Sequence, residues 1–128
     1  MDPRRIARAK RAARHARRYG TWRPVCLVCG LSDILARYEH HHIAARFHGR
    51  RLSWATVLLC RRCHDRSSDM QQDDPPLPRH LDPAIARWVL SNRGLIHLLE
   101  LSLNELKSRT EDLAALGAML PTRAPGDE

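Results

Sequence analysis

The sequence predicts a small α+β protein, in which two strands and a helix form a central unit with further helices on both sides. Two Cys-x-x-Cys pairs enclose segments with the β-branched and apolar residues of short strands. An Asp-Pro pair, a typical helix start, precedes a helix-forming segment near each end of the chain. At 128 residues, the chain has room for one modest core or a small module with helical extensions.

The first predicted element is a basic helical arm, residues 1–21. Asp2 would cap it, Pro3 would take the first helical position and Gly20 would end it. The segment is mainly Ala and Arg with almost no apolar face, so we expect it to become ordered on a partner. Phosphate contact is favoured over a solubilising tail, with contacts expected from Arg4, Arg5, Arg8, Arg11, Arg14, Arg17 and Arg18.

Charge is unevenly distributed along the chain. The formal net charge of +8 divides into +7 for residues 1–18, +5 for residues 19–66 and −4 for residues 67–128. A basic first half favours a polyanionic partner, above all nucleic acid. No apolar run is long enough to cross a bilayer and no hydrophobic leader is present, so we expect a soluble cytoplasmic protein.

The four cysteines stand in two pairs, Cys26 with Cys29 and Cys60 with Cys63. Each pair can offer two thiolates to one ion, which is the arrangement of a tetrahedral structural zinc site. Two disulfides or a redox role are the alternatives, but a chain without an export signal is expected to keep its thiols reduced. Zinc would fasten the two ends of the intervening segment and so compensate for a small core.

Residues 22–72 form the predicted zinc module. YEHHHIAA, residues 38–45, is expected to be a short strand that enters a loop, with a turn near residues 49–50. WATVLLC, residues 54–60, is the second strand, and CRRCHDRSSD, residues 60–69, should begin or precede a helix. This order is a ββα unit closed by a zinc site with four cysteine ligands. It can bring the histidine run of the first strand opposite the histidine after the last cysteine.

Cys-x-x-Cys, then His-His-Ile, then Leu-Cys-x-x-Cys-His resembles the HNH endonuclease family, in its zinc-containing subgroup with a ββα-metal fold. The resemblance covers about residues 22–70. It implies a metal-dependent DNA endonuclease, acting on one strand as a nickase or on both, in a bacterial or phage-infected cell. The catalytic divalent metal would be Mg²⁺, Mn²⁺, Ni²⁺ or Zn²⁺, in addition to the structural Zn²⁺.

The resemblance also implies roles for three histidines. His41 and His64 fall on metal ligands and His42 falls on the general base. Phosphodiester hydrolysis needs a base with a pKa near neutrality and a cation near the phosphate, and these side chains can supply both. Because adjacent strand residues point to opposite faces, His41 and His42 could share a site only if the chain bends between them.

The sequence departs from the family at the asparagine that normally holds the loop. That residue usually stands shortly before the Leu-Cys pair, where this chain has Ala55 and Thr56. Thr56 could replace part of the hydrogen bonding and Ala55 could not. Loop rigidity and catalytic rate are therefore in doubt, whereas metal ligation is not directly affected.

Further polar residues surround the motif. His40 and His48 have no assigned role; each is expected to be solvated or, as an alternative, to touch DNA, and His48 could also add a ligand. Arg46, Arg50 and Arg51 flank the predicted site, and one of them could bind the scissile phosphate.

A Pro-rich linker, residues 73–82, leads to a helical appendage at residues 83–120. The appendage should contain two helices, the first ending near Gly94, the second starting at Leu95. The first helix has an apolar face of Ile85, Trp88 and Val89.

The second helix carries a stripe at alternating spacings of four and three, and residues 121–128 are expected to be disordered. The stripe could dock on the first helix or form a short coiled coil with a second copy or another protein. Two of its members, Thr110 and Gly117, favour the intrachain alternative. The stripe consists of Leu99, Leu103, Leu106, Thr110, Leu113, Gly117 and Leu120.

Two other functional classes compete with the nuclease. A non-catalytic zinc-finger module would bind nucleic acid without cleaving it, and the missing asparagine favours this alternative. A partner-dependent phage or mobile-element protein would act mainly through its C-terminal helices. RNA is an open alternative to DNA, because phosphate binding and water activation do not distinguish the sugars.

Overall fold

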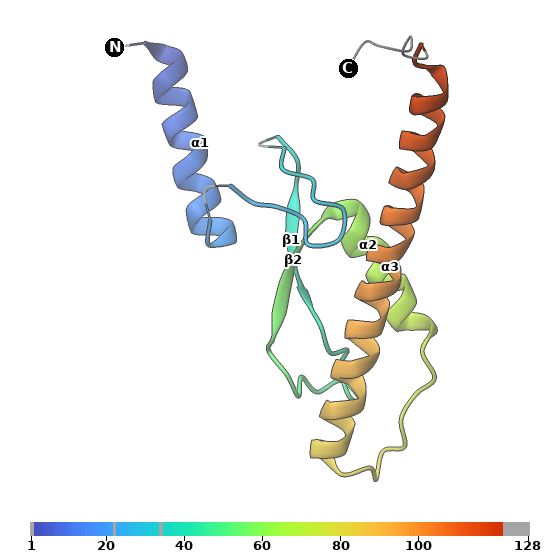
Figure 1. Cartoon of the computed structure of the whole chain (residues 1–128). Helices are drawn as coiled ribbons and strands as arrows, with labels where there is room; N and C mark the ends of the chain where they lie inside the picture. Colours follow the sequence, from blue (N-terminus) through green and yellow to red (C-terminus); the bar gives the residue numbers. More distant parts are fainter. Residues whose placement is uncertain (1, 22, 34, 122–128) are drawn as a thin grey trace.

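The computed structural model describes residues 2–21, 23–33 and 35–121. The described chain has a two-stranded sheet and three helices, which confirms the α+β class. Figure 1 shows the N-terminal helix on one side of the sheet and the other helices on the opposite side. Nothing in the described helices combines the length and apolarity needed to cross a bilayer. The elements are α1 (Pro3–Tyr19), β1 (Tyr38–His42), β2 (Thr56–Cys60), α2 (Arg61–Asp73) and α3 (Pro83–Met119).

Helix α1 has the caps that the sequence predicts. The Asp2 carboxylate accepts a hydrogen bond from the Arg4 backbone N–H, and Gly20 ends the helix at a φ of 75°. The one described side chain of α1 that is buried is Tyr19, whose ring meets Tyr38 of β1 edge-on at a centroid distance of 5.6 Å. The helix is therefore anchored at its C-terminal end, and its arginines remain on the surface.

Strands β1 and β2 form an antiparallel hairpin in which Tyr38 pairs with Cys60 and His42 with Thr56. The turn predicted near residues 49–50 is present: Phe47 and Arg50 exchange two backbone hydrogen bonds around His48 and Gly49, which both have positive φ. Two positive φ values are typical of a type I′ turn, whose twist matches that of paired strands. Strand β2 starts at Thr56, two residues later than predicted.

Two apolar clusters lie between the hairpin and α3. The first contains the cysteines, Tyr38 and Leu59, and the second lies around Phe47 and Ala44. Helix α3 contributes to both, with Leu98 and Leu101 in the first and Ala86 and Leu90 in the second. It also binds α2 through Glu105, whose carboxylate lies 2.7 Å from the guanidinium of Arg62.

The predicted helix end at Gly94 is wrong, because α3 runs without a break from Pro83 to Met119. Gly94 is buried in the middle of the helix, between Leu90 and Leu98 on the same face. A Cβ atom at this position would lie 1.7 Å from the carbonyl oxygen of Ile43. The glycine is therefore required for close contact between α3 and the loop after β1, and it does not terminate the helix.

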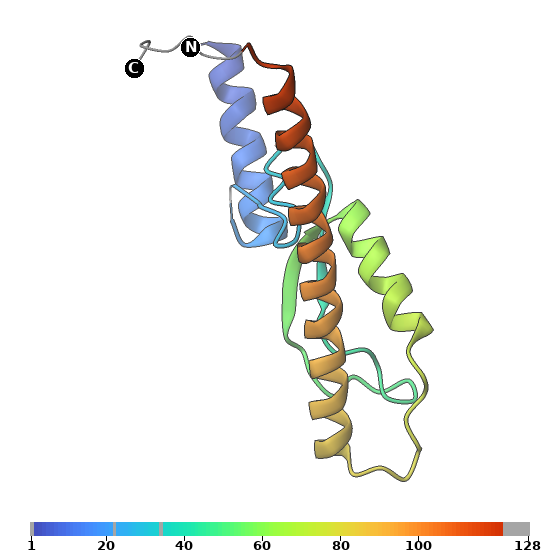
Figure 2. The same ribbon diagram turned by 45° about the vertical axis from the view of Figure 1, so that its right-hand side comes forward.

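The predicted intrachain docking of the leucine stripe is also wrong. Without a break at Gly94 there is no second helix that could fold back, and Figure 2 shows the C-terminal half of α3 extending away from the sheet and α2. Leu99, Leu106 and Leu113 are each more than 60 % exposed. Of the tail predicted to be disordered, residues 122–128 lie outside the described part of the chain.

We expect Gly94→Ala to lower the free energy of unfolding by about 1–3 kcal/mol, because the new methyl group would overlap the Ile43 carbonyl. Gly117→Ala is the matched control, since a Cβ there meets nothing within 4 Å and alanine favours a helix by up to about 1 kcal/mol. Denaturant titration followed by circular dichroism measures both. Equal stability of the two variants would contradict the close contact at Gly94.

Candidate functional site

The four cysteines form a buried cluster. Their sulfur atoms all lie within 4.8 Å of one another, and the Sγ atoms of Cys29 and Cys60 are 3.7 Å apart. A disulfide would need about 2.05 Å, whereas thiolates around one tetrahedral zinc ion are about 3.8 Å apart. The cluster is therefore free of disulfides and could hold a metal ion such as zinc.

Local backbone structure orients both cysteine pairs. In the first pair, the Gly30 N–H donates to the Cys26 carbonyl, and a φ of 72° at Gly30 closes the turn. In the second, Cys60 ends β2 and caps α2, and Cys63 lies in the first turn of that helix. Burial raises the pKa of the Cys60 and Cys63 thiols, so a bound cation would have to displace their protons.

The histidines lie beside a separate cavity of about 340 Å³. The bend that the sequence made a condition for a site shared by His41 and His42 is absent, since β1 stays paired with β2 through His42. His41 is 3 % exposed and His42 is half-buried. Strand β1 is paired on one side only, so a cavity along its open edge can meet side chains from both faces. The lining residues are His40, His41, His42, Ala45, Arg46, Arg51, His64, Ser68, Gln71 and Gln72.

The imidazole rings of His41 and His64 lie next to each other beside the cavity. Their rings are perpendicular with centroids 5.2 Å apart, and two imidazoles on one tetrahedral ion would have centroids about 5 Å apart. The Nε2 atom of His41 is 2.9 Å from the buried Ser67 hydroxyl, which leaves Nδ1 for ligation. Burial, followed by the neighbouring His64, His42 and Arg51, lowers the pKa of His41 to about 4, so the ring is neutral at pH 7.

Glu39 joins this pair, although the sequence analysis did not select it. Its carboxylate Oε2 lies 3.3 Å from Nδ1 of His64, a buried atom without a hydrogen-bond partner among the described residues. Strand alternation could have revealed Glu39, because it stands two residues before His41 on the same face. The Oδ1 atom of Asp65 lies 3.5 Å from the same nitrogen, so two carboxylates approach the His64 ring.

His42 has the surroundings of a base. Burial, together with Arg51 and Arg46, lowers its pKa, so its imidazole is neutral and able to accept a proton at pH 7. Arg51 also donates to the Ala44 carbonyl at 2.6 Å, which fixes its side chain beside the cavity. The exposed Trp54, which the sequence analysis did not select, meets His42 edge-on at 6.0 Å.

The loop after His42 is held without the asparagine of the family motif. The Gln71 side-chain amide donates to the carbonyls of His42 and Ile43, at 3.2 and 3.0 Å. The Ile43 N–H donates to the carbonyl of Ala55, one of the two residues at the asparagine position. Gln71 on α2 therefore supplies a side-chain hydrogen bond to this loop, from a position that the motif does not mark.

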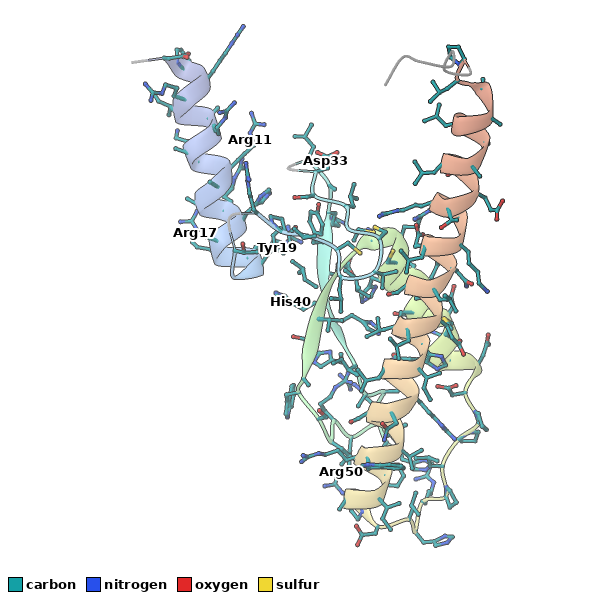
Figure 3. The ribbon with its side chains drawn as sticks, in the orientation of Figure 1. Arg11, Arg17, Tyr19, Asp33, His40 and Arg50 are labelled. Atoms are coloured by element: carbon teal, nitrogen blue, oxygen red, sulfur yellow. The ribbon has the colours of Figure 1, made fainter. Side chains whose placement is uncertain are left out.

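The remaining predicted residues divide between structural and surface positions. His40 points to the end of α1, where its Nε2 lies 3.3 Å from the Arg18 carbonyl (Figure 3). His48 is a turn residue whose Nε2 lies 2.6 Å from the Leu77 carbonyl of the linker. Arg46 and Arg51 line the cavity, but Arg50 does not, and Figure 3 shows it at the opposite end of the molecule from α1.

A basic groove of about 610 Å³ runs between α1 and the segment before β1. Four of the predicted phosphate-binding arginines line it, together with Arg37, which the sequence analysis did not select. Arg18 lines the groove and His40 lines the histidine cavity. The two residues contact each other and so link the groove to the cavity. The groove is lined by Arg11, Arg14, His15, Arg17, Arg18, Tyr19, Leu35, Ala36 and Arg37. Arg4, Arg5 and Arg8 do not line it.

Comparison of the chain with models of protein families, with curated proteins and with solved structures found no match. The likeness to the HNH family therefore stays a prediction based on the motif residues.

We expect Gln71→Ala to lower the free energy of unfolding by about 1–3 kcal/mol, because two loop carbonyls lose their donor. Gln72→Ala changes the exposed neighbouring glutamine and should cost less than about 0.5 kcal/mol. Chemical denaturation of the two variants in parallel measures the difference. Indistinguishable unfolding curves would show that the amide does not hold the loop.

Proposed function

We propose that this protein is a metal-dependent endonuclease that hydrolyses phosphodiester bonds in DNA. The observation that carries the proposal is the cavity in which His41, His42 and His64 meet Arg46 and Arg51. The neutral imidazoles of His41 and His42 and the guanidinium groups in one cavity of this size suit a phosphodiester and an attacking water molecule.

In the proposed reaction His42 removes a proton from the water that attacks phosphorus. Its lowered pKa keeps the imidazole neutral and ready for this step near pH 7. Arg46 and Arg51 orient the phosphate and offset its charge. A divalent ion held by His41 and His64, with Glu39 beside them, would supply positive charge to the phosphate and the departing oxygen.

The basic groove supports nucleic acid as the substrate. Five arginines along one groove suit successive phosphates of a strand, and the Arg18–His40 contact leads from that groove to the cavity. A strand lying along α1 could therefore continue to His42. Helix α1 would then act as the phosphate-binding arm that its composition predicts.

We propose zinc as the ion of the cysteine cluster and expect one zinc per chain by elemental analysis. A strong chelator or Cys63→Ser should remove the metal and unfold the module, because the cluster joins its segments. A thiol reductant alone should leave stability unchanged. Metal-free protein that is unfolded by the reductant would instead indicate disulfides.

We expect the purified chain to nick or linearise supercoiled plasmid with Mg²⁺, Mn²⁺, Ni²⁺ or Zn²⁺, and not with EDTA. His42→Ala should slow cleavage by about 10²- to 10⁴-fold, the usual contribution of a general base. His80→Ala is the matched control, an exposed histidine of the linker that does not line the cavity, and should cleave at the parental rate. Circular dichroism and zinc content must be unchanged in both variants.

A second candidate is a binding module without catalysis, which the basic groove favours independently of the cavity. The same plasmid experiment separates the two functions. Plasmid that is retarded in a gel but stays intact with every metal would reject the nuclease and favour the binding module.

A further inference from the structure

Helix α3 has two apolar faces, and among the described residues only one of them is buried. Ala86, Leu90, Gly94, Leu98 and Leu101 are buried against the module. A second face, offset around the helix, continues the predicted stripe toward the N-terminus with a seven-residue repeat. This heptad face consists of Ile85, Val89, Asn92, Ile96, Leu99, Leu103, Leu106, Thr110, Leu113, Gly117 and Leu120.

The heptad face is open to solvent from Ile96 to Leu120, and its members Val89 and Asn92 are half-buried. Ile96 is 50 % exposed and Leu106 is 61 % exposed, and every described side chain from Leu106 to Leu120 is exposed. A helical segment whose side chains are this exposed is only marginally stable in water on its own. An apolar surface of this extent on a free helix indicates that a partner covers it.

The charges on this part of α3 argue against nucleic acid or an anionic membrane as the partner. Residues 95–120 contain four acidic residues and two basic ones. Helices that bind membrane surfaces or phosphates are basic. A regular repeat of apolar residues four and three apart instead suits another helix with the same repeat, and this chain carries one.

We propose that the heptad face of α3 pairs with the same face of a second copy, with the two helices antiparallel. Leu103 then packs against Leu106 of the other copy in two equivalent central layers. Ile96 meets Leu113 of the other copy, and Leu99 meets Thr110. The C-terminal half of one α3 thereby packs along the heptad face of the N-terminal half of the other α3. This N-terminal half is the part that contacts the module in its own copy.

Charge complementarity selects the antiparallel orientation. Glu100 and Lys107 flank the heptad face at equivalent positions of successive repeats. In an antiparallel pair centred on Leu103 and Leu106, Glu100 of each copy faces Lys107 of the other, which gives two ion pairs. In a parallel pair in register, Lys107 faces Ser102 and Glu100 faces Leu95, so neither charge finds an opposite charge.

The antiparallel pair also accommodates the two weak positions of the stripe. Thr110 lies opposite Leu99, and Gly117 lies opposite Asn92 near the ends of the contact, so no central layer joins two weak residues. A parallel pair would place Thr110 against Thr110 and Gly117 against Gly117. The surface that contacts the module is not needed for the pairing, because its buried residues lie outside the heptad positions.

Sedimentation equilibrium of the full chain tests the proposal. We expect a mass of twice 14.7 kDa at tens of micromolar protein. Leu106→Glu should raise the dissociation constant by at least about 100-fold, because it introduces a charge into both central layers. Ser108→Glu, at an exposed position off the heptad face, is the matched control and should remain dimeric.

A charge exchange tests the orientation. Glu100→Lys or Lys107→Glu alone should raise the dissociation constant by about tenfold, because each creates two like-charge pairs, and the two changes together should restore it. A dimer that is insensitive to these changes would overturn the antiparallel arrangement. A chain that is monomeric at all concentrations, or equally affected by Leu106→Glu and Ser108→Glu, would overturn the dimer.

Discussion

The cysteine cluster is the constraint on which the arrangement of the module depends. It joins the turn around Cys26 and Cys29 to the point where β2 ends and α2 begins. Tyr38 and Leu59 pack around it, and the ring of Tyr38 in turn contacts the ring of Tyr19 of α1. A module with so few large buried side chains gains stability when two segments distant in the sequence are joined at one point.

Helix α3 provides the second constraint. It contacts both apolar clusters along one face, and Gly94 allows its backbone to approach the Ile43 carbonyl between them. The same carbonyl accepts a hydrogen bond from Gln71 of α2. Two helices therefore fix the loop that follows His42. The C-terminal helix thus supports the cavity, although none of its residues lines it.

The histidine run is divided among three environments. His40 faces the end of α1, His41 is buried against Ser67 and α2, and His42 lies beside Arg46 and Arg51. Such a division places a buried neutral imidazole and a more accessible one in the same cavity, which is the combination that the proposed hydrolysis needs. The cavity and the cysteine cluster share no residue, so a structural ion and a catalytic ion would have different ligands.

Local patterns determined the helix starts at Asp2 and Asp82, the hairpin turn and the cysteine pairs, because capping, turn chemistry and ligand spacing act over a few residues. The family motif directed attention to His41, His42 and His64. Tertiary structure alone decided the unbroken course of α3, since a glycine ends a helix or permits a close contact depending on what lies beside it. It also decided the parts played by Glu39 and Gln71, because each depends on a partner more than twenty residues away in the chain.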